Sequence, residues 1–408
     1  MIKASFSRSS RACQQPTRSR RALLSGDRVL LSSIILLAAS FCLSADCRAA
    51  TGRLIEVADD TQRYVGRVIS MEGDTCCLVD RFGRIEHLSV PKLKSFRVVS
   101  ERYRAASSSE VREQLRQEFP GYDVSGTAHY LVCGPRGRSQ AYAALLEDTY
   151  RQIEQFYRAR GFRTTTPEVV MVAVVFRTQQ EFADYCRRDD VPVAEDLRGY
   201  YSLRSNRVAL FETPRRPVRT LAGEEETAEL EEEQSLTGLP GEPDRDTTDT
   251  MAHEGTHQVG YNIGIHSRVT STPTWVLEGL ATVLEVPGAR APSGFAPSES
   301  RFNQQRLRWF REQYATRRQA GDVARLVASE EPFEREPLDA YSEAWALTFF
   351  MSESPARTQQ FVRYLRAVEG RDTSGTYTSQ DRLRDFQEAF GDIARLEVDF
   401  LRFMDSLE

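Results

Sequence analysis

Residues 251–264, MAHEGTHQVGYNIG, decide how the C-terminal part of this 408-residue chain is interpreted. They contain His253-Glu254-Gly255-Thr256-His257, in which two histidines stand four residues apart. Residues four apart on a helix lie one turn apart on the same face, so both imidazoles can reach one metal ion. Glu254 is then placed to take a proton from water on that ion. The spacing predicts a helix over residues 248–262 that carries a catalytic zinc (Zn²⁺) site.

The structural alternative is that the two histidines only pack against their neighbours. Because the chain has just five histidines, chance rarely produces this pattern, and we favour the metal site. Thr247, Thr248 or Asp249 can cap the start of the helix, and Gly264 can end it.

Zinc in a hydrolase normally has three protein ligands and an open position for water, so a third ligand must be found. One known arrangement places a third histidine six residues after the second, with a glycine between them. Gly260 fits that arrangement, but the ligand position holds Ile263, and His266 comes three residues too late.

Glu278 provides the other solution. It lies in a predicted helix over residues 273–285 that is otherwise mainly apolar, and a carboxylate on an apolar face requires a partner. A zinc ion would be that partner, so Glu278 is the expected third ligand. Glu285, seven residues later, lies on roughly the same face but nearer the helix end, and is the lesser candidate.

Two segments, HEGTH at 253–257 and WVLEGLA at 275–281, resemble those of the gluzincin zinc metallopeptidases. Within that group the chain is similar to peptidase-MA-like exported bacterial proteins of unassigned function. The resemblance covers residues 127–405. It implies a zincin-like α+β domain, with a mixed sheet followed by a helical C-terminal half, and residues 199–211 at a sheet edge beside the cleft.

The resemblance also implies the roles of the site residues. It makes His253, His257 and Glu278 the zinc ligands and Glu254 the general base, acting on a peptide or protein substrate. Tyr341 resembles the later tyrosine or histidine with which many gluzincins steady an oxyanion, with ordinary aromatic packing as the alternative.

One position departs from the pattern of that group. Thermolysin-like members carry an acid four residues after the glutamate ligand, where it orients a histidine, but this chain has Thr282 there. The corresponding contact must therefore come from elsewhere or be absent.

The length favours more than one domain, because single cores rarely grow this large. We expect a leader over residues 1–50, a small antiparallel β module over 51–104 that could be SH3-like, and a connector helix within 105–126. The peptidase domain would follow over 127–408. Its residues 223–247 hold seven glutamates between Glu224 and Glu233, which predicts a solvated loop.

The leader has the order of an export signal. Seven basic residues and one acid lie in residues 1–28, and the apolar run VLLSSIILLAASFCL at 29–43 precedes small residues. We expect a cleaved signal peptide, with a retained anchor as the alternative and the only route to membrane attachment. The body would be periplasmic, on the cell surface or secreted.

Charge and cysteine usage limit other functions. The formal net charge of -5, with no basic stripe, argues against nucleic acid as a partner. Cys76, Cys77, Cys133 and Cys186 follow the leader without a CxxC pair, which excludes a cysteine zinc site and leaves one or two disulfides open. Oligomeric state has no signal in the sequence.

The expected function is therefore that of an exported zinc-dependent peptidase. A non-catalytic zinc-binding surface or scaffold protein that retains the zincin fold is the alternative. It would be distinguished by a closed metal site with a fourth protein ligand, for which His266 is the candidate.

Overall fold

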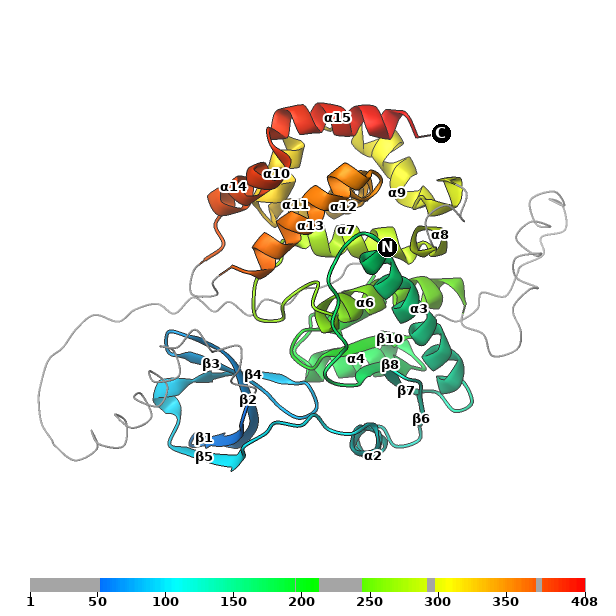
Figure 1. Cartoon of the computed structure of the whole chain (residues 1–408). Coiled ribbons are helices and arrows are strands. Elements are labelled where there is room, and N and C mark those ends of the chain that lie inside the picture. Colours follow the sequence, from blue (N-terminus) through cyan, green and yellow to red (C-terminus); the bar gives the residue numbers. More distant parts are fainter. Residues whose placement is uncertain (1–51, 195, 213–243, 292–297, 372–375, 408) are drawn as a thin grey trace, which may run out of the picture. The chain divides into compact units, whose positions relative to one another are not determined.

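A computed structural model describes residues 52–194, 196–212, 244–291, 298–371 and 376–407. The chain divides into two compact units, one ending at Ala106 and the other beginning at Ser107. The expected α+β class is confirmed: an antiparallel β module precedes a mixed sheet and a helical C-terminal half (Figure 1). The expected leader and residues 223–243 of the acidic loop lie outside the described residues.

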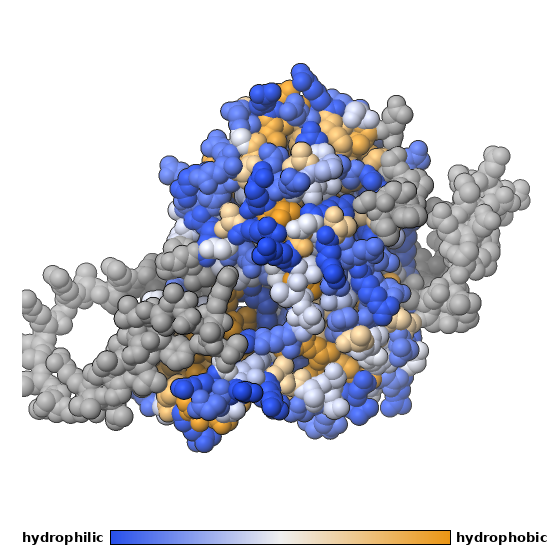
Figure 2. All heavy atoms as spheres, viewed as in Figure 1, coloured by the Kyte–Doolittle hydropathy of each residue, from blue (hydrophilic) through white to orange (hydrophobic). Residues whose placement is uncertain are grey.

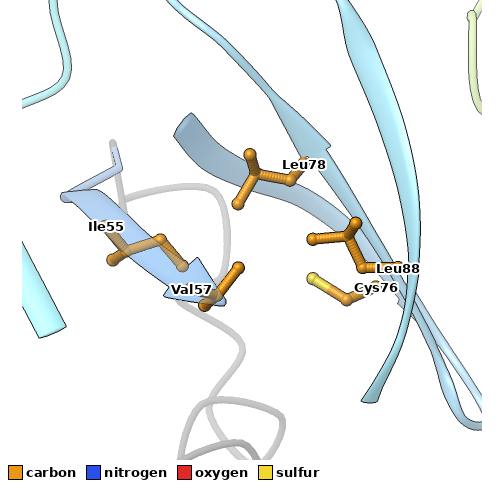
Figure 3. Packing of buried hydrophobic residues seen from close by; sticks show 5 residues of the cluster. All are labelled: Ile55, Val57, Cys76, Leu78 and Leu88. Atoms are coloured by element: carbon orange, nitrogen blue, oxygen red, sulfur yellow. The ribbon is translucent and has the colours of Figure 1, made fainter. Parts of the chain in front are cut away.

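The N-terminal unit is a five-stranded antiparallel sheet in the order β4-β3-β2-β1-β5. Its elements are β1 (Leu54–Ala58), β2 (Arg63–Glu72), β3 (Thr75–Val79), β4 (Ile85–Ser89), η1 (Val90–Lys92) and β5 (Ser95–Ser100). Figure 3 shows its small core, in which side chains of β1, β3 and β4 converge: Ile55, Val57, Cys76, Leu78 and Leu88. Large apolar side chains of β5, including Phe96 and Val99, stay exposed.

The second unit begins with a five-stranded mixed sheet in the order β6-β7-β8-β10-β9. The elements are α2 (Ser108–Glu118), β6 (Asp123–Gly126), β7 (Tyr130–Gly134), α3 (Ser139–Ala159), β8 (Met171–Phe176), α4 (Gln179–Arg188), β9 (Gly199–Ser202) and β10 (Arg207–Phe211). Strands β7, β8 and β10 run parallel, and the edge strands β6 and β9 are antiparallel. Every residue of β8 is buried, as its valine-rich sequence predicts.

Helices make up the rest of the second unit. They are α6 (Arg245–Asn262), α7 (Thr274–Glu285), α8 (Pro287–Arg290), η2 (Ser298–Arg301), α9 (Gln304–Arg308), η3 (Trp309–Tyr314), α10 (Asp322–Ala328), α11 (Glu331–Arg335), α12 (Pro337–Ser352), α13 (Pro355–Glu369), α14 (Ser379–Phe390) and α15 (Ile393–Asp405). Figure 1 shows α6 between the sheet and α7, with α12 and α13 next to α7 on its other side. The face in Figure 2 is mostly hydrophilic, with hydrophobic residues in smaller groups.

Several expected helix boundaries are wrong. Helix α6 begins at Arg245 and not at residue 248, because the Asp244 carboxylate accepts the Thr247 N–H at 3.0 Å and caps the helix earlier. The helical pattern of the sequence also predicts one helix over residues 301–318, where the structure has a short α9 followed by the π-helical turn η3. The same pattern predicts one helix over residues 380–406, but Gly391, with a φ of 85°, ends α14 before α15 begins.

The remaining expectations concern disulfides and membrane-spanning segments. Cys76, Cys77, Cys133 and Cys186 are all buried and free, so no disulfide joins them. Among the described residues, no helix is both long and apolar enough to cross a bilayer.

Candidate metal centre

Helix α6 is fixed to the sheet by one buried amide side chain. Gln258 Nε2 donates to the backbone oxygen of Val172 in β8 at 3.0 Å and to that of Asn206 at 2.8 Å, at the start of β10. Asn262, one turn further along α6, exchanges side-chain hydrogen bonds with Asn206. These contacts hold α6 against the sheet, and every residue from Thr250 to Tyr261, His253 and His257 included, is buried.

Helix α7 lies against α6 on one side and against α12 on the other. All residues from Trp275 to Leu284 are buried, and Trp275 stacks on Tyr364 of α13 with ring centroids 5.8 Å apart. Gly279 permits the close approach to α12, because a Cβ there would lie 2.6 Å from the backbone oxygen of Ala344. This packing holds Glu278 against the histidine pair.

The structure brings the three expected ligands together. One ligand atom from each of His253, His257 and Glu278 lies within 4.8 Å of the others, and all three side chains are at most 2% exposed. The two Nε2 atoms are 3.3 Å apart. Glu278 Oε2 lies 3.3 Å from His253 Nε2, and Glu278 Oε1 lies 3.6 Å from His257 Nε2.

The two 3.3 Å separations match those in a tetrahedral zinc site, and the 3.6 Å separation joins His257 to the other oxygen of Glu278. Bonds of about 2.0–2.1 Å at tetrahedral angles place ligand atoms about 3.3–3.4 Å apart. Both oxygens of Glu278 are buried without a hydrogen bond of ordinary geometry, which is costly for a carboxylate unless a cation binds it. The donor set of two imidazoles and one carboxylate, and its spacing, therefore fit a zinc ion.

The three ligands shift one another's protonation. Burial opposes charge on His253, but the carboxylates of Glu278 and Glu285 outweigh it and hold the pKa of His253 well above its ordinary value. Burial lowers the pKa of His257 to about 4. Burial also raises the pKa of Glu278, but the His257 and His253 imidazoles more than offset this, and the resulting pKa is lowered. The cluster thus balances buried charge of both signs.

Glu254 lies beside the cluster with no exposed surface. Neither of its oxygens has a hydrogen bond of ordinary geometry. Burial raises its pKa to about 7, against the opposing effect of the His253 imidazole and, to a smaller extent, of the Tyr201 backbone N–H in the edge strand β9. A carboxylate so placed has its lone pairs available for a proton.

Glu285 is not a member of the ligand cluster. Its Oε1 lies 2.6 Å from His253 Nδ1, the imidazole nitrogen that faces away from the cluster. A carboxylate on this nitrogen fixes the ring orientation and leaves Nε2 for the metal. In thermolysin-like proteins an acid at the position of Thr282 orients a metal-binding histidine. Here Glu285, three residues later on α7, makes that contact with His253. The sequence placed Glu285 on the right face but did not indicate which imidazole nitrogen it meets.

Tyr341 of α12 also reaches the site. It is buried, and its hydroxyl adds to the larger effects of the two imidazoles in lowering the pKa of Glu278. Its ring packs edge-on against Phe333, and the guanidinium of Arg306 lies 5.3 Å from the ring centroid. The aromatic packing is thus present, and the oxyanion role that the resemblance implies stays a prediction.

His266 packs near the site without joining the ligands. The chain turns at Gly264, and the backbone N–H groups of Ile265 and His266 donate to the Gly260 oxygen at 3.0 and 3.1 Å. The His266 ring lies over Gly260, where a Cβ would stand 2.8 Å from its Cδ2. Gly260 is therefore explained by this packing. Among the described residues the cluster has three members, and His266 is not one of them.

A comparison with protein families gives a match for part of the chain. The family described as "Protein of unknown function (DUF1570)" matches residues 247–373, which is less than a third of the chain and contains the whole ligand cluster. No curated protein matches the sequence.

Proposed function

We propose that this chain is an exported zinc-dependent peptidase of the gluzincin type. The observation that carries the proposal is the buried cluster of His253, His257 and Glu278, in which one ligand atom of each lies within 4.8 Å of the others, with the buried Glu254 carboxylate beside them. Three protein ligands leave one of four tetrahedral positions open, which is typical of catalytic zinc and not of structural zinc.

Zinc bound by His253, His257 and Glu278 would supply a Lewis acid that polarises a peptide carbonyl and makes a water molecule more acidic. Glu254 would accept the proton of the attacking water and return it to the leaving amine. A carboxyl group with a pKa near neutrality suits both tasks. Tyr341 would donate a hydrogen bond to the developing oxyanion.

The substrate would be a peptide or protein outside the cytoplasm. The export pattern of residues 1–50 supports this location, and the net charge of -5 gives no reason to add nucleic acid as a partner. The edge strand β9 is next to Glu254 through Tyr201, and an extended peptide could pair with such an edge.

One observation favours a second candidate, a non-catalytic zinc protein. His253, Glu254 and Glu278 have no exposed surface, so a peptide would reach them only after some movement of the chain. In a non-catalytic protein the zinc would contribute to folding alone. The absence of His266 from the cluster of described residues counts against a closed site with four protein ligands.

The deciding experiment is zinc content together with cleavage of a random peptide library, for wild type, Glu254→Gln and His253→Ala. Glu254→Gln should keep one zinc per chain and lose at least about 100-fold in turnover, because it removes the proton acceptor and leaves the ligands. His253→Ala should lose both zinc and activity.

His87→Ala is the matched control, because it removes a histidine of the other unit and should change neither quantity. Turnover retained in Glu254→Gln would refute the proposed base. A wild type that holds zinc tightly but cleaves no peptide would favour the non-catalytic candidate.

A further inference from the structure

Asn303 forms a hydrogen bond with Glu285, the residue that contacts His253 of the candidate metal centre. Its Nδ2 donates to Glu285 Oε2 at 2.9 Å, while Glu285 Oε1 takes the hydrogen bond of His253 Nδ1 at 2.6 Å. The two oxygens of one carboxylate are therefore each held by a different partner. Asn303 is remote in sequence from both metal-binding helices, and the motifs in α6 and α7 do not indicate it.

We propose that Asn303 is a positioning residue of the metal site, which orients His253 through Glu285. The proposal rests on the zinc site of the proposed function and does not depend on peptide hydrolysis. A carboxylate with one free oxygen can rotate about its Cγ–Cδ bond and lose its partner. Asn303 removes that freedom, and the imidazole keeps its Nε2 directed at the other two ligands.

The Asn303 side chain also forms a second hydrogen bond, which restricts its orientation. Asn303 is the N-cap of α9, where its Oδ1 accepts the Arg306 N–H at 3.1 Å. Because the amide oxygen is engaged by the helix, the amide nitrogen is directed at Glu285. Asparagine is suited to this position since serine could cap the helix but would have no second donor that reaches the carboxylate.

The backbone around Glu285 is held independently. Arg290, a buried residue of α8, donates from Nη1 to the backbone oxygens of Leu284 and Glu285 at 2.6 and 3.2 Å, and from Nε to Gln152 Oε1 at 2.9 Å. These bonds satisfy carbonyls at the C-terminus of α7, which have no partner within the helix. With the backbone fixed in this way, the remaining freedom of Glu285 is in its side chain, where Asn303 acts.

The effect should appear in metal affinity. Loss of the residue that orients a metal-binding histidine typically costs about 10–100-fold in affinity, which is the expectation for Glu285→Gln. Asn303 acts one contact further away, so its loss should cost less, about 3–10-fold.

The test compares Asn303→Ser with Asn303→Ala in the full chain. Zn²⁺ affinity is measured by competition with a chromophoric chelator, and the melting temperature is measured on metal-free protein. Serine keeps the helix cap and removes the donor to Glu285, whereas alanine removes both. Both variants should lose about 3–10-fold in Zn²⁺ affinity, and only Asn303→Ala should melt earlier without metal. The visible spectrum of the Co²⁺-loaded protein should change in both.

Thr378→Ala is the control, because Thr378 caps α14, away from the ligands, and should lower the metal-free melting temperature without changing Zn²⁺ affinity. Wild-type Zn²⁺ affinity and an unchanged Co²⁺ spectrum in Asn303→Ser would overturn the proposal. A Zn²⁺ effect in a protein that cleaves no peptide would support it and would separate it from the peptidase proposal.

Discussion

At the scale of single residues, His253 is the side chain on which most of the site depends. Its two ring nitrogens face different carboxylates, Nε2 toward Glu278 at 3.3 Å and Nδ1 toward Glu285 at 2.6 Å. The ring has no exposed surface, so neither nitrogen can use water in place of these partners. Its orientation is therefore determined by two residues of α7, and this explains why α7 must pack tightly on α6.

A second buried group, away from the metal ligands, allows a test of the electrostatics. Arg318 holds the carboxylates of both Glu343 and Glu397, at 3.0 and 2.5 Å, and Glu397 also accepts the Gly321 N–H. Glu343 shares the Arg318 guanidinium with Glu397, and its side chain is buried. Burial raises its pKa from 4.5 to about 7, although Arg318 acts in the opposite direction.

We predict that Glu343 makes the protein less stable as pH rises. Between pH 4.5 and about 7 the folded state holds a proton on Glu343 that the unfolded state has released. The free energy of unfolding therefore falls as the pH rises through this range. The loss is at most about 3 kcal/mol. In Glu343→Gln, urea unfolding at pH 5 and pH 8 should show a smaller loss than wild type. Parallel stability curves for the two proteins would show that Glu343 is not protonated in the fold.

The chemistry of the residues was enough to predict the three candidate ligands from the sequence. It predicted only some of the residues that orient those ligands. Glu278 stood out because a carboxylate in an apolar helix needs a partner. Glu285 was placed on the correct face by its spacing of seven, yet its contact with Nδ1 depends on how α7 crosses α6. Asn303 gave no signal, because a capping asparagine looks the same whether or not its amide meets a distant carboxylate.

At the scale of elements, the crossing of α7 and α12 is the closest contact that supports the site. A Cβ at Gly279 would lie 2.6 Å from the Ala344 backbone oxygen and closer still to Thr348 Oγ1. Gly255 of α6 is different, since a Cβ there would meet its nearest neighbour, Leu146 Cδ2, at an ordinary 3.4 Å.

These two glycines therefore make a matched pair of alanine substitutions. Gly279→Ala should force α7 away from α12 at a cost of about 1–3 kcal/mol and should weaken Zn²⁺ binding, because Glu278 moves with the helix. Gly255→Ala should be neutral or stabilise α6 by up to about 1 kcal/mol. Thermal unfolding and chelator competition measure both effects. Equal effects of the two substitutions would contradict the packing described for α7.

Helix existence was easier to predict than helix ends. The apolar pattern of the sequence predicts helices over residues 141–159, 273–285, 338–352 and 356–369, and the structure has α3, α7, α12 and α13 there. The start of α6 was missed since Asp244 follows an acidic, proline-containing segment and caps the helix before its apolar residues begin. The break at Gly391 was missed because apolar residues continue on both sides of it.

At the scale of the whole molecule, the candidate metal centre lies in one unit. The ligands, Glu254, Glu285 and Asn303, together with the hydrogen-bond partners described here, all lie within residues 107–408. The N-terminal unit has its own small core of five buried residues. Each unit is therefore expected to hold its structure through its own contacts.

It follows that removal of residues 1–106 should leave the candidate metal site unchanged. A chain that starts at Ser107 should bind Zn²⁺ with an affinity within about threefold of the full chain, because no ligand or ligand-orienting residue is lost. Chelator competition on both chains provides the comparison. A large loss of affinity in the shorter chain would mean that the N-terminal unit contributes to the site.

The central claim is that His253, His257 and Glu278 hold one zinc ion. Zinc K-edge X-ray absorption on the full chain, purified with zinc and dialysed, tests it most directly. We expect one zinc per chain with nitrogen and oxygen neighbours at about 2.0–2.1 Å, the scattering pattern of two imidazoles, and loss of the bound zinc in His257→Ala. Zinc content near zero in wild type, or sulfur neighbours at about 2.3 Å, would contradict it.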